Sequence, residues 1–245
     1  MKLTFVYCCI LQLLIAKLAN AQSERDSSIS RSLSIHRQNN DNKHFLLSAS
    51  IGYGYRPANL PDDLNSVERD YYSKLRNGFY YAFEGAVFFK GKGGAGVIYS
   101  NFKTDNSIDN VTVYPKSGPV LTGTVADEIT ISAIGIQGYY KLWNKNHNAL
   151  FCLNAGLNYL DYNNKATVIT PFIIQGNTVG IDIGFTYFLR VSPEFLLGPF
   201  FNYETGVLSE YTIDDGQNVV KYKFKENEGE SMNHLGIGIK GAYTF

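Results

Sequence analysis

The sequence predicts an all-β fold in which eight antiparallel strands run up and down and close into a transmembrane barrel. Eight segments alternate apolar and polar residues with the period of two that a strand requires. Long polar segments and short turns alternate between them, as in barrels with long loops on one side of a membrane. The last strand ends the chain, and pairing it with the first would leave no open sheet edge.

The first 21 residues predict a signal peptide. Lys2 supplies a positive charge, the stretch 3–18 is mostly apolar, and Ala19-Asn20-Ala21 has the small-x-small form of a cleavage site. An uncleaved anchor helix is the alternative, but Gln12 and Lys17 interrupt the apolar run. Elsewhere nothing approaches the roughly 20 apolar residues of a transmembrane helix.

Three regions follow from this composition. Residues 1–21 form the signal peptide, 22–43 a flexible polar lead-in on the periplasmic side, and 44–245 the barrel domain. Lysine and arginine (22) balance aspartate and glutamate (22), which gives no electrostatic reason to expect a nucleic-acid partner. Cys152 is the one cysteine after the leader, so no internal disulfide is expected.

The first three strands show the alternation in its simplest form. The segments 44–56 and about 77–90 each carry large apolar residues at every second position. A glycine-rich turn at 91–94 leads into a third strand at about 94–103. Its G-x-G-x-x-G spacing enters a strand, whereas a dinucleotide site would require a helix there, so we predict a hairpin turn.

The remaining strands continue the pattern with one irregularity. In the fourth strand, about 127–142, the isoleucines before and after Ala133 fall on opposite parities, so we expect a β-bulge near Ala133. The fifth to seventh strands, at 149–160, 177–190 and about 194–206, alternate aliphatic and aromatic residues with glycine, asparagine and acidic residues.

The connections differ in length in a regular way. Long polar loops are expected at 57–76, 104–126, 161–176 and 207–231, and short turns at 91–94, 143–148 and 191–194. Within the last loop, Asp214-Asp215-Gly216 lies between two short apolar runs and predicts a small hairpin. Long loops on the extracellular side place both termini in the periplasm.

The last strand, 232–245, separates Leu235, Ile237, Ile239, Tyr243 and Phe245 from small or polar residues on its other face. A soluble lipocalin-like barrel could hide such an apolar face inside. The aromatics of this parity are too bulky to fill an eight-stranded interior together, whereas the glycine, serine and asparagine of the other parity would fit. We therefore expect the apolar face to point into lipid.

With this pattern the chain resembles the small eight-stranded outer-membrane β-barrel proteins of Gram-negative bacteria, over about 44–245 and the leader. In that family the barrel-assembly machinery reads a terminal aromatic pair, which Tyr243 and Phe245 resemble, although Lys240 stands where the signal often has glycine. The resemblance implies an outer-membrane location, with outer-membrane lipid, lipopolysaccharide and the assembly machinery as partners. A surface or periplasmic protein partner is possible.

The inward parity carries several ionisable residues. They are Arg56, Glu84, Glu128, Asp182, Glu204, His234 and Lys240. Because charges sealed in a narrow barrel must pair or neutralise, we expect a polar network in the lumen made by Arg56, Glu84, Asp182, Glu204 and Lys240. Lys240 should pair with Glu84 or Asp182 and close the lumen.

Three functions fit this sequence. The first is a non-enzymatic structural or surface-interaction barrel that acts through its long loops. The second is a narrow pore or an accessory of a secretion system. The third is a lipid-modifying enzyme that uses a trio of Ser231, His234 and Glu230, but residues so close along one loop rarely hold triad geometry. We expect the first function, with no catalytic residue, metal or cofactor.

Overall fold

The computed structural model describes residues 44–57, 60, 64–89, 92–113, 119–225 and 228–245. The predicted signal peptide, the lead-in and part of the turn at 91–94 lie outside these residues. Among the described residues no helix is long and apolar enough to cross a membrane.

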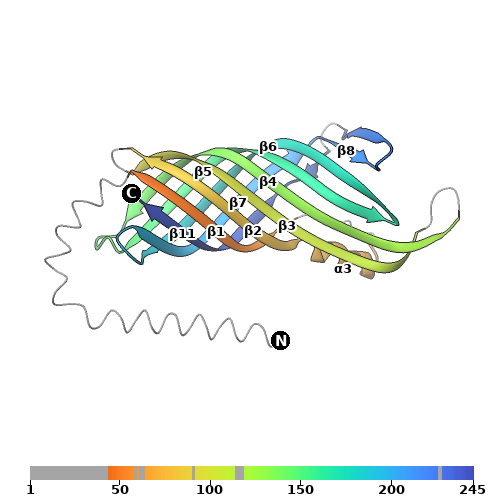
Figure 1. The fold of residues 1–245 in the computed structure, drawn as a ribbon, viewed down its shortest axis with the longest axis horizontal. Coiled ribbons are helices and arrows are strands. Elements are labelled where there is room, and N and C mark those ends of the chain that lie inside the picture. Colours follow the sequence, from red (N-terminus) through yellow and green to blue (C-terminus); the bar gives the residue numbers. More distant parts are fainter. Residues whose placement is uncertain (1–43, 58–59, 61–63, 90–91, 114–118, 226–227) are drawn as a thin grey trace, which may run out of the picture. The chain divides into compact units, whose positions relative to one another are not determined.

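Eight strands form a closed antiparallel ring (Figure 1). They are β1 (Phe45–Tyr55), β2 (Asn77–Phe88), β3 (Gly93–Val113), β4 (Leu121–Trp143), β5 (Ala149–Val168), β6 (Thr170–Arg190), β7 (Phe195–Leu208) and β11 (His234–Thr244). Each strand pairs with the next along the chain, and β11 pairs with both β7 and β1. The last strand thus protects the edge of the first, and the predicted eight-stranded up-and-down barrel is confirmed.

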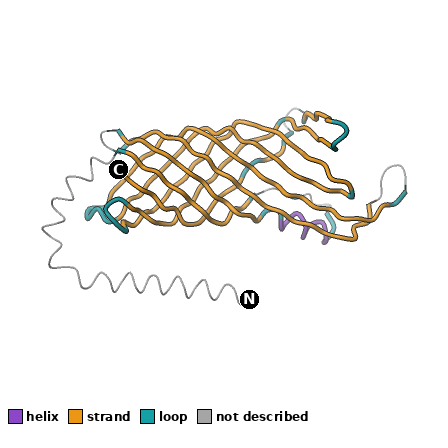
Figure 2. The backbone as a smooth tube through the Cα atoms, in the orientation of Figure 1, coloured by secondary structure: helices purple, strands orange, loops and turns teal. Residues whose placement is uncertain are grey.

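Two hairpins extend far beyond the predicted strand ends (Figure 2). β3 and β4 pair as far as Val113↔Leu121, and β5 and β6 pair as far as Val168↔Thr170. The loops predicted at 104–126 and 161–176 are therefore wrong, because most of these residues continue the sheet. We call this end of the barrel the protruding end and the opposite end the short-turn end.

The protruding end carries four smaller elements. β8 (Glu210–Asp214) and β9 (Val219–Lys223) form the hairpin predicted around Asp215, and β8 also pairs with β6. β10 (Glu230–Ser231) pairs with the end of β7. The helix α3 (Ser66–Lys74), within the predicted loop 57–76, was not expected; the Asn65 and Glu68 side chains form a capping box at its start.

The barrel exterior is apolar over one continuous belt. Large apolar side chains are exposed on all eight strands, among them Ile51, Phe83, Val97, Ile136, Leu157, Ile181, Leu197 and Ile239. The edge of the belt nearest the protruding end is a row of four exposed residues that are cross-strand neighbours: Tyr99, Ile134, Tyr159 and Val179.

The next outward row is polar. It consists of Asn101, Ser132, Asp161 and Asn177, which again lie opposite one another on β3 to β6. A belt of exposed aliphatic and aromatic residues that ends along one line is the surface expected where a barrel leaves a bilayer. The protruding end therefore begins at this row.

The same boundary explains the phase change in β4. The pairing of β4 with β5 runs without a shift from Val125 to Trp143, so the bulge predicted near Ala133 is wrong. Ile131 lies past the boundary and points inward, away from water, whereas Ile134 lies within the belt and points outward toward lipid. The β4 backbone is therefore regular at Ala133, and what changes along the strand is its surroundings, from lipid within the belt to water beyond it.

Three layers of side chains fill the barrel along its length, and β5 shows their order. Leu150 and Cys152 belong to an apolar cluster at the short-turn end, Asn154 to a polar layer, and Leu160 and Tyr162 to an apolar cluster at the protruding end. The polar layer comprises Ser50, Glu84, Ser100, Gln137, Asn154, Asn158, Asp182, Asn202, Glu204, His234 and Lys240, all buried.

Candidate functional site

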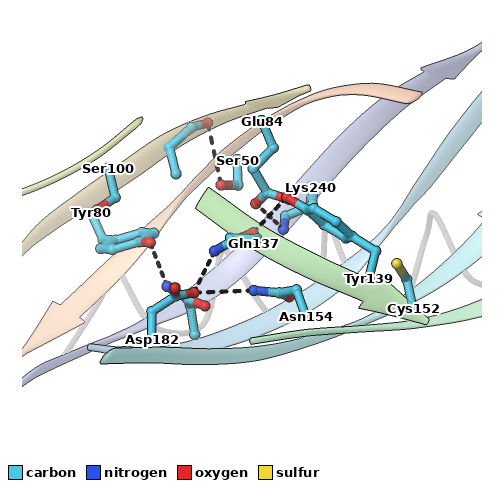
Figure 3. Close-up of polar contacts among 12 residues, drawn as sticks. Ser50, Tyr80, Glu84, Ser100, Gln137, Tyr139, Cys152, Asn154, Asp182 and Lys240 are labelled. Atoms are coloured by element: carbon cyan, nitrogen blue, oxygen red, sulfur yellow. Dashed lines mark hydrogen bonds and ion pairs between the residues drawn. The ribbon is translucent and has the colours of Figure 1, made fainter. Parts of the chain in front are cut away.

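The polar layer is built around an ion pair inside the lumen that joins β11 and β2, the two neighbours of β1. Lys240 on β11 donates to Glu84 on β2, and the two side chains are only 6% and 5% exposed (Figure 3). Lys240 Nζ also lies 5.5 Å from the centroid of the Phe200 ring. Of the two partners expected for Lys240, the structure provides Glu84. A pair buried this deeply can persist only because each charge compensates the other.

Hydrogen bonds extend this pair toward Asp182. The Tyr139 hydroxyl lies 3.3 Å from Glu84 Oε2 and also contacts the Gln137 side chain. Gln137 Nε2 and Asn154 Nδ2 both donate to Asp182 Oδ2, the latter over 3.2 Å (Figure 3). Asp182 is fully buried on β6, and neutral amides rather than a cation hold its carboxylate.

A second cluster surrounds Glu204 on β7, the direct cross-strand neighbour of Asp182. Its Oε1 accepts hydrogen bonds from Ser100 Oγ at 2.5 Å and Asn202 Nδ2 at 3.2 Å. Its Oε2 lies 3.4 Å from His234 Nε2, within ion-pair distance although the two atoms make no hydrogen bond. His234 is fully buried, and its Nδ1 lies 2.9 Å from Met232 O.

Glycines on the inner face make room for these groups. A Cβ at Gly156 would lie 2.9 Å from Asp182 Oδ1, and one at Gly184 would lie 2.4 Å from Asn202 Oδ1. The polar side chains therefore occupy the volume that larger residues would need in an eight-stranded interior.

Two predicted interior residues lie elsewhere. Arg56 is buried at the protruding end, where Nη2 donates to Glu230 Oε1 at 2.5 Å and to Ser231 O at 2.7 Å. Glu128 points outward above the belt, with Lys103 Nζ at 2.7 Å and Lys165 Nζ at 3.8 Å from its Oε1, so its expected place in the interior is wrong. The Lys103 hydrogen bond and charge lower the pKa of Glu128. Its parity was misread because the apolar face of β4 changes sides at the boundary.

The enzyme hypothesis finds no geometric support at its three residues. The Glu230 carboxylate binds Arg56, Ser231 Oγ accepts from the Asn233 amide at 3.3 Å, and His234 lies buried against Glu204. The trio is therefore not assembled. Across the part of the chain that the structure describes, no group of three or more His, Cys, Asp or Glu side chains is arranged to hold a metal.

Several residues that form hydrogen bonds in or beside the polar layer are not among those singled out from the sequence. Gln137, Tyr139 and Asn154 connect the Lys240–Glu84 pair to Asp182, and Ser100 and Tyr80 bind Glu204. The sequence signal that could have identified them is that they are uncharged polar residues at inward-facing positions of the strands.

The terminal aromatics lie on the outer surface next to the first strand. Phe245 stacks on Phe45 with ring centroids 5.4 Å apart, and backbone hydrogen bonds of 3.0 and 3.2 Å join the same two residues. Tyr243 is exposed beside them, with its ring 5.9 Å from Phe245. Recognition of this pair by an assembly machinery stays a prediction.

The closed ring, the apolar belt and the filled lumen define an integral membrane β-barrel of the outer-membrane type. No protein-family model and no curated protein sequence matches the chain. Among solved structures, it is similar to a major outer membrane protein from Thermus thermophilus, with 14% identity, a TM-score of 0.52, and 82% and 99% of the two chains covered.

Two further solved structures agree. Neisserial surface protein A is 12% identical with a TM-score of 0.50, over 82% of this chain and 97% of that one. The outer membrane protein OprG from Pseudomonas aeruginosa is 10% identical with a TM-score of 0.50, over 83% and 96%. The chain thus has the fold of the small eight-stranded outer-membrane barrels.

Proposed function

We propose that this chain is a non-enzymatic, non-conducting outer-membrane barrel that presents its protruding end to partners outside the cell. The observation that carries this proposal is the contrast between the two parts of the molecule. The lumen is filled by two apolar clusters and an ion-paired polar layer, whereas two long hairpins and a helix project beyond the belt.

The filled lumen supports the non-conducting role. Leu160, Phe102 and Ile131 are fully buried in the interior toward the protruding end, and Leu150 and Phe188 fill the short-turn end. An ion would have to displace these apolar side chains and break the Lys240–Glu84 pair, both of which oppose conduction.

Hydrogen bonds that hold the protruding end in one arrangement support an interaction role. Tyr71 of α3 donates to Asp127 Oδ2 at 2.6 Å, and Asn106 Nδ2 donates back to Tyr71 O at 3.0 Å. Burial and the Asp127 hydrogen bond raise the pKa of Tyr71, so the phenol keeps its proton in this contact. A surface held in one arrangement loses less conformational entropy when it binds.

Two measurements test the proposal. Purified full chain in planar bilayers should show no stepwise single-channel current, whereas regular open steps would favour the narrow-pore alternative. Cells that display the full chain should adhere to a surface coated with extracellular-matrix protein more strongly than cells whose chain has 106–126 replaced by a two-residue turn. Equal adhesion by both would contradict the interaction role for that hairpin.

A further inference from the structure

A polar notch opens on the outer wall where β6 changes its partner. β6 pairs with β7 from Gly180 toward the short-turn end and with β8 over Ile173–Gln175, and the notch lies between these two pairings. Its volume is about 340 Å³, which is at the lower end of the range for small-ligand sites. It is lined by Asp161, Gln175, Gly176, Asn177, Glu210, Tyr211, Thr212 and Lys221.

Several polar groups in the notch are available to a ligand. The side chains of Asp161, Gln175 and Asn177 are exposed and make no hydrogen bond or ion pair with any other described residue. Glu210 Oε1 lies 2.6 Å from Lys221 Nζ, and each of these groups keeps further hydrogen-bonding capacity. The notch therefore offers carboxylate acceptors, amides that donate and accept, and an ammonium donor.

The charge of the notch selects among polar ligands. Asp161 and Glu210 carry two negative charges and Lys221 one positive charge, so the lining is negative by one. Such a surface repels phosphate and sulfate. A neutral molecule with several adjacent hydroxyls can donate to the carboxylates and accept from the amides and the ammonium at once.

The position of the notch next to the edge of the apolar belt indicates the source of that ligand. Asp161 and Asn177 form the first polar pair above Tyr159 and Val179, which are 49% and 69% exposed at the limit of the apolar belt. The notch thus faces the layer in which the headgroups of the outer leaflet lie.

We propose that this notch binds a neutral saccharide unit in the headgroup of a membrane glycolipid. The two carboxylates accept hydrogen bonds from sugar hydroxyls, Asn177 and Gln175 fix the orientation of the ring, and Lys221 donates to a ring or hydroxyl oxygen. This site is independent of the proposed interaction at the hairpin tips, because it lies on the wall beneath them.

The test uses the full chain in detergent micelles and a dephosphorylated core oligosaccharide prepared from lipopolysaccharide, with binding followed by saturation-transfer NMR. The intact protein should bind the oligosaccharide, and Asp161→Asn and Gln175→Ala should each weaken binding about tenfold or more, as expected when a hydrogen bond to a charged or well-placed group is lost. Asp105→Asn is the matched control, since Asp105 is exposed on β3 outside the notch and should leave binding unchanged.

Three outcomes would overturn the proposal. The intact protein does not bind the oligosaccharide; or Asp161→Asn and Gln175→Ala bind it as well as the Asp105→Asn control does; or inorganic phosphate at equal concentration displaces it, which would define an anion site. Barrel formation, checked by gel mobility of unboiled samples, shows that each variant is folded. None of these results would bear on adhesion through the hairpins, so the two proposals fail separately.

Discussion

At the scale of single residues, burial determines how strongly the loss of a charged side chain destabilises the barrel. Lys240 and Glu84 compensate each other inside the membrane-spanning part of the barrel, where removing one partner leaves the other as an isolated charge. Lys165 offers a contrast, because it is exposed and contacts Glu128 at 3.8 Å in water. Surface pairs of this kind contribute little.

Lys240→Ala should therefore lower the free energy of unfolding by about 3–5 kcal/mol, the usual effect of breaking a buried pair. Urea-induced unfolding in phospholipid vesicles measures it, with Lys165→Ala as the control for losing a lysine. The double variant Lys240→Ala/Glu84→Ala should recover part of the loss, because no unpaired charge remains. Equal stability of Lys240→Ala and Lys165→Ala would contradict an ion pair in the lumen.

Asp215 gives a residue-scale prediction for pH. Its carboxylate accepts from the Gln217 and Asn218 amides at 2.9 and 2.7 Å in the β8–β9 turn, and these backbone hydrogen bonds lower its pKa below the ordinary 3.8. A lowered pKa means that the turn is stabilised above that ordinary value and loses this contribution as the pH falls through the lowered one. The NMR shifts of both amides should change there, and Asp215→Ala should abolish the change. Amide shifts that respond identically in the variant would count against this assignment.

At the scale of elements, each long strand belongs to two environments. In β4 the outward residue Ile136 faces lipid and Ser132 lies at the boundary, although only four positions separate them. A lysine in the middle of the bilayer costs about 2–4 kcal/mol, whereas near the interface it costs about 0–1 kcal/mol.

Ile136→Lys should therefore destabilise the barrel by about 2–4 kcal/mol and Ser132→Lys by no more than about 1 kcal/mol. Guanidinium unfolding in vesicles compares the two variants directly, and both add the same side chain to the same face of the same strand. Similar costs at the two positions would show that the boundary does not lie at the Asn101–Ser132–Asp161–Asn177 row.

At the scale of the whole molecule, the sequence predicted the closed barrel because every strand within the belt follows one rule. Its apolar side chains point outward into lipid, and its small or polar side chains point inward. Above the belt that rule reverses, so the sequence pattern predicts a bulge near Ala133, an internal Glu128 and loops at the hairpin ends, none of which is found among the described residues. The helix α3 was missed because nine residues after a proline-rich segment give a weak period, although Asn65 and Glu68 form a capping signature. The sequence predicted a buried partner for Lys240 but left Glu84 and Asp182 as alternatives, and the structure shows Glu84 as the partner.

The β1–β11 pairing closes the ring from Tyr55↔Leu235 to the Phe45–Phe245 hydrogen bonds, and its last residue tests the architecture. Phe245 joins β11 to β1 through two backbone hydrogen bonds and a stacked ring on Phe45. Unboiled membrane samples of the full chain should migrate faster on a detergent gel than boiled ones, because the closed barrel stays compact. A chain that lacks Phe245 should show a weaker shift and less material in the membrane.

Phe224→Ala is the control for this measurement, since Phe224 packs against Tyr211 near the β8–β9 hairpin and takes no part in closure. It should keep the full shift. If instead the complete chain is recovered from the soluble periplasm with no shift, the apolar belt cannot face lipid, because a folded soluble protein would not leave so many aliphatic and aromatic side chains in water. The strands would then have to turn this face inward, around a ligand.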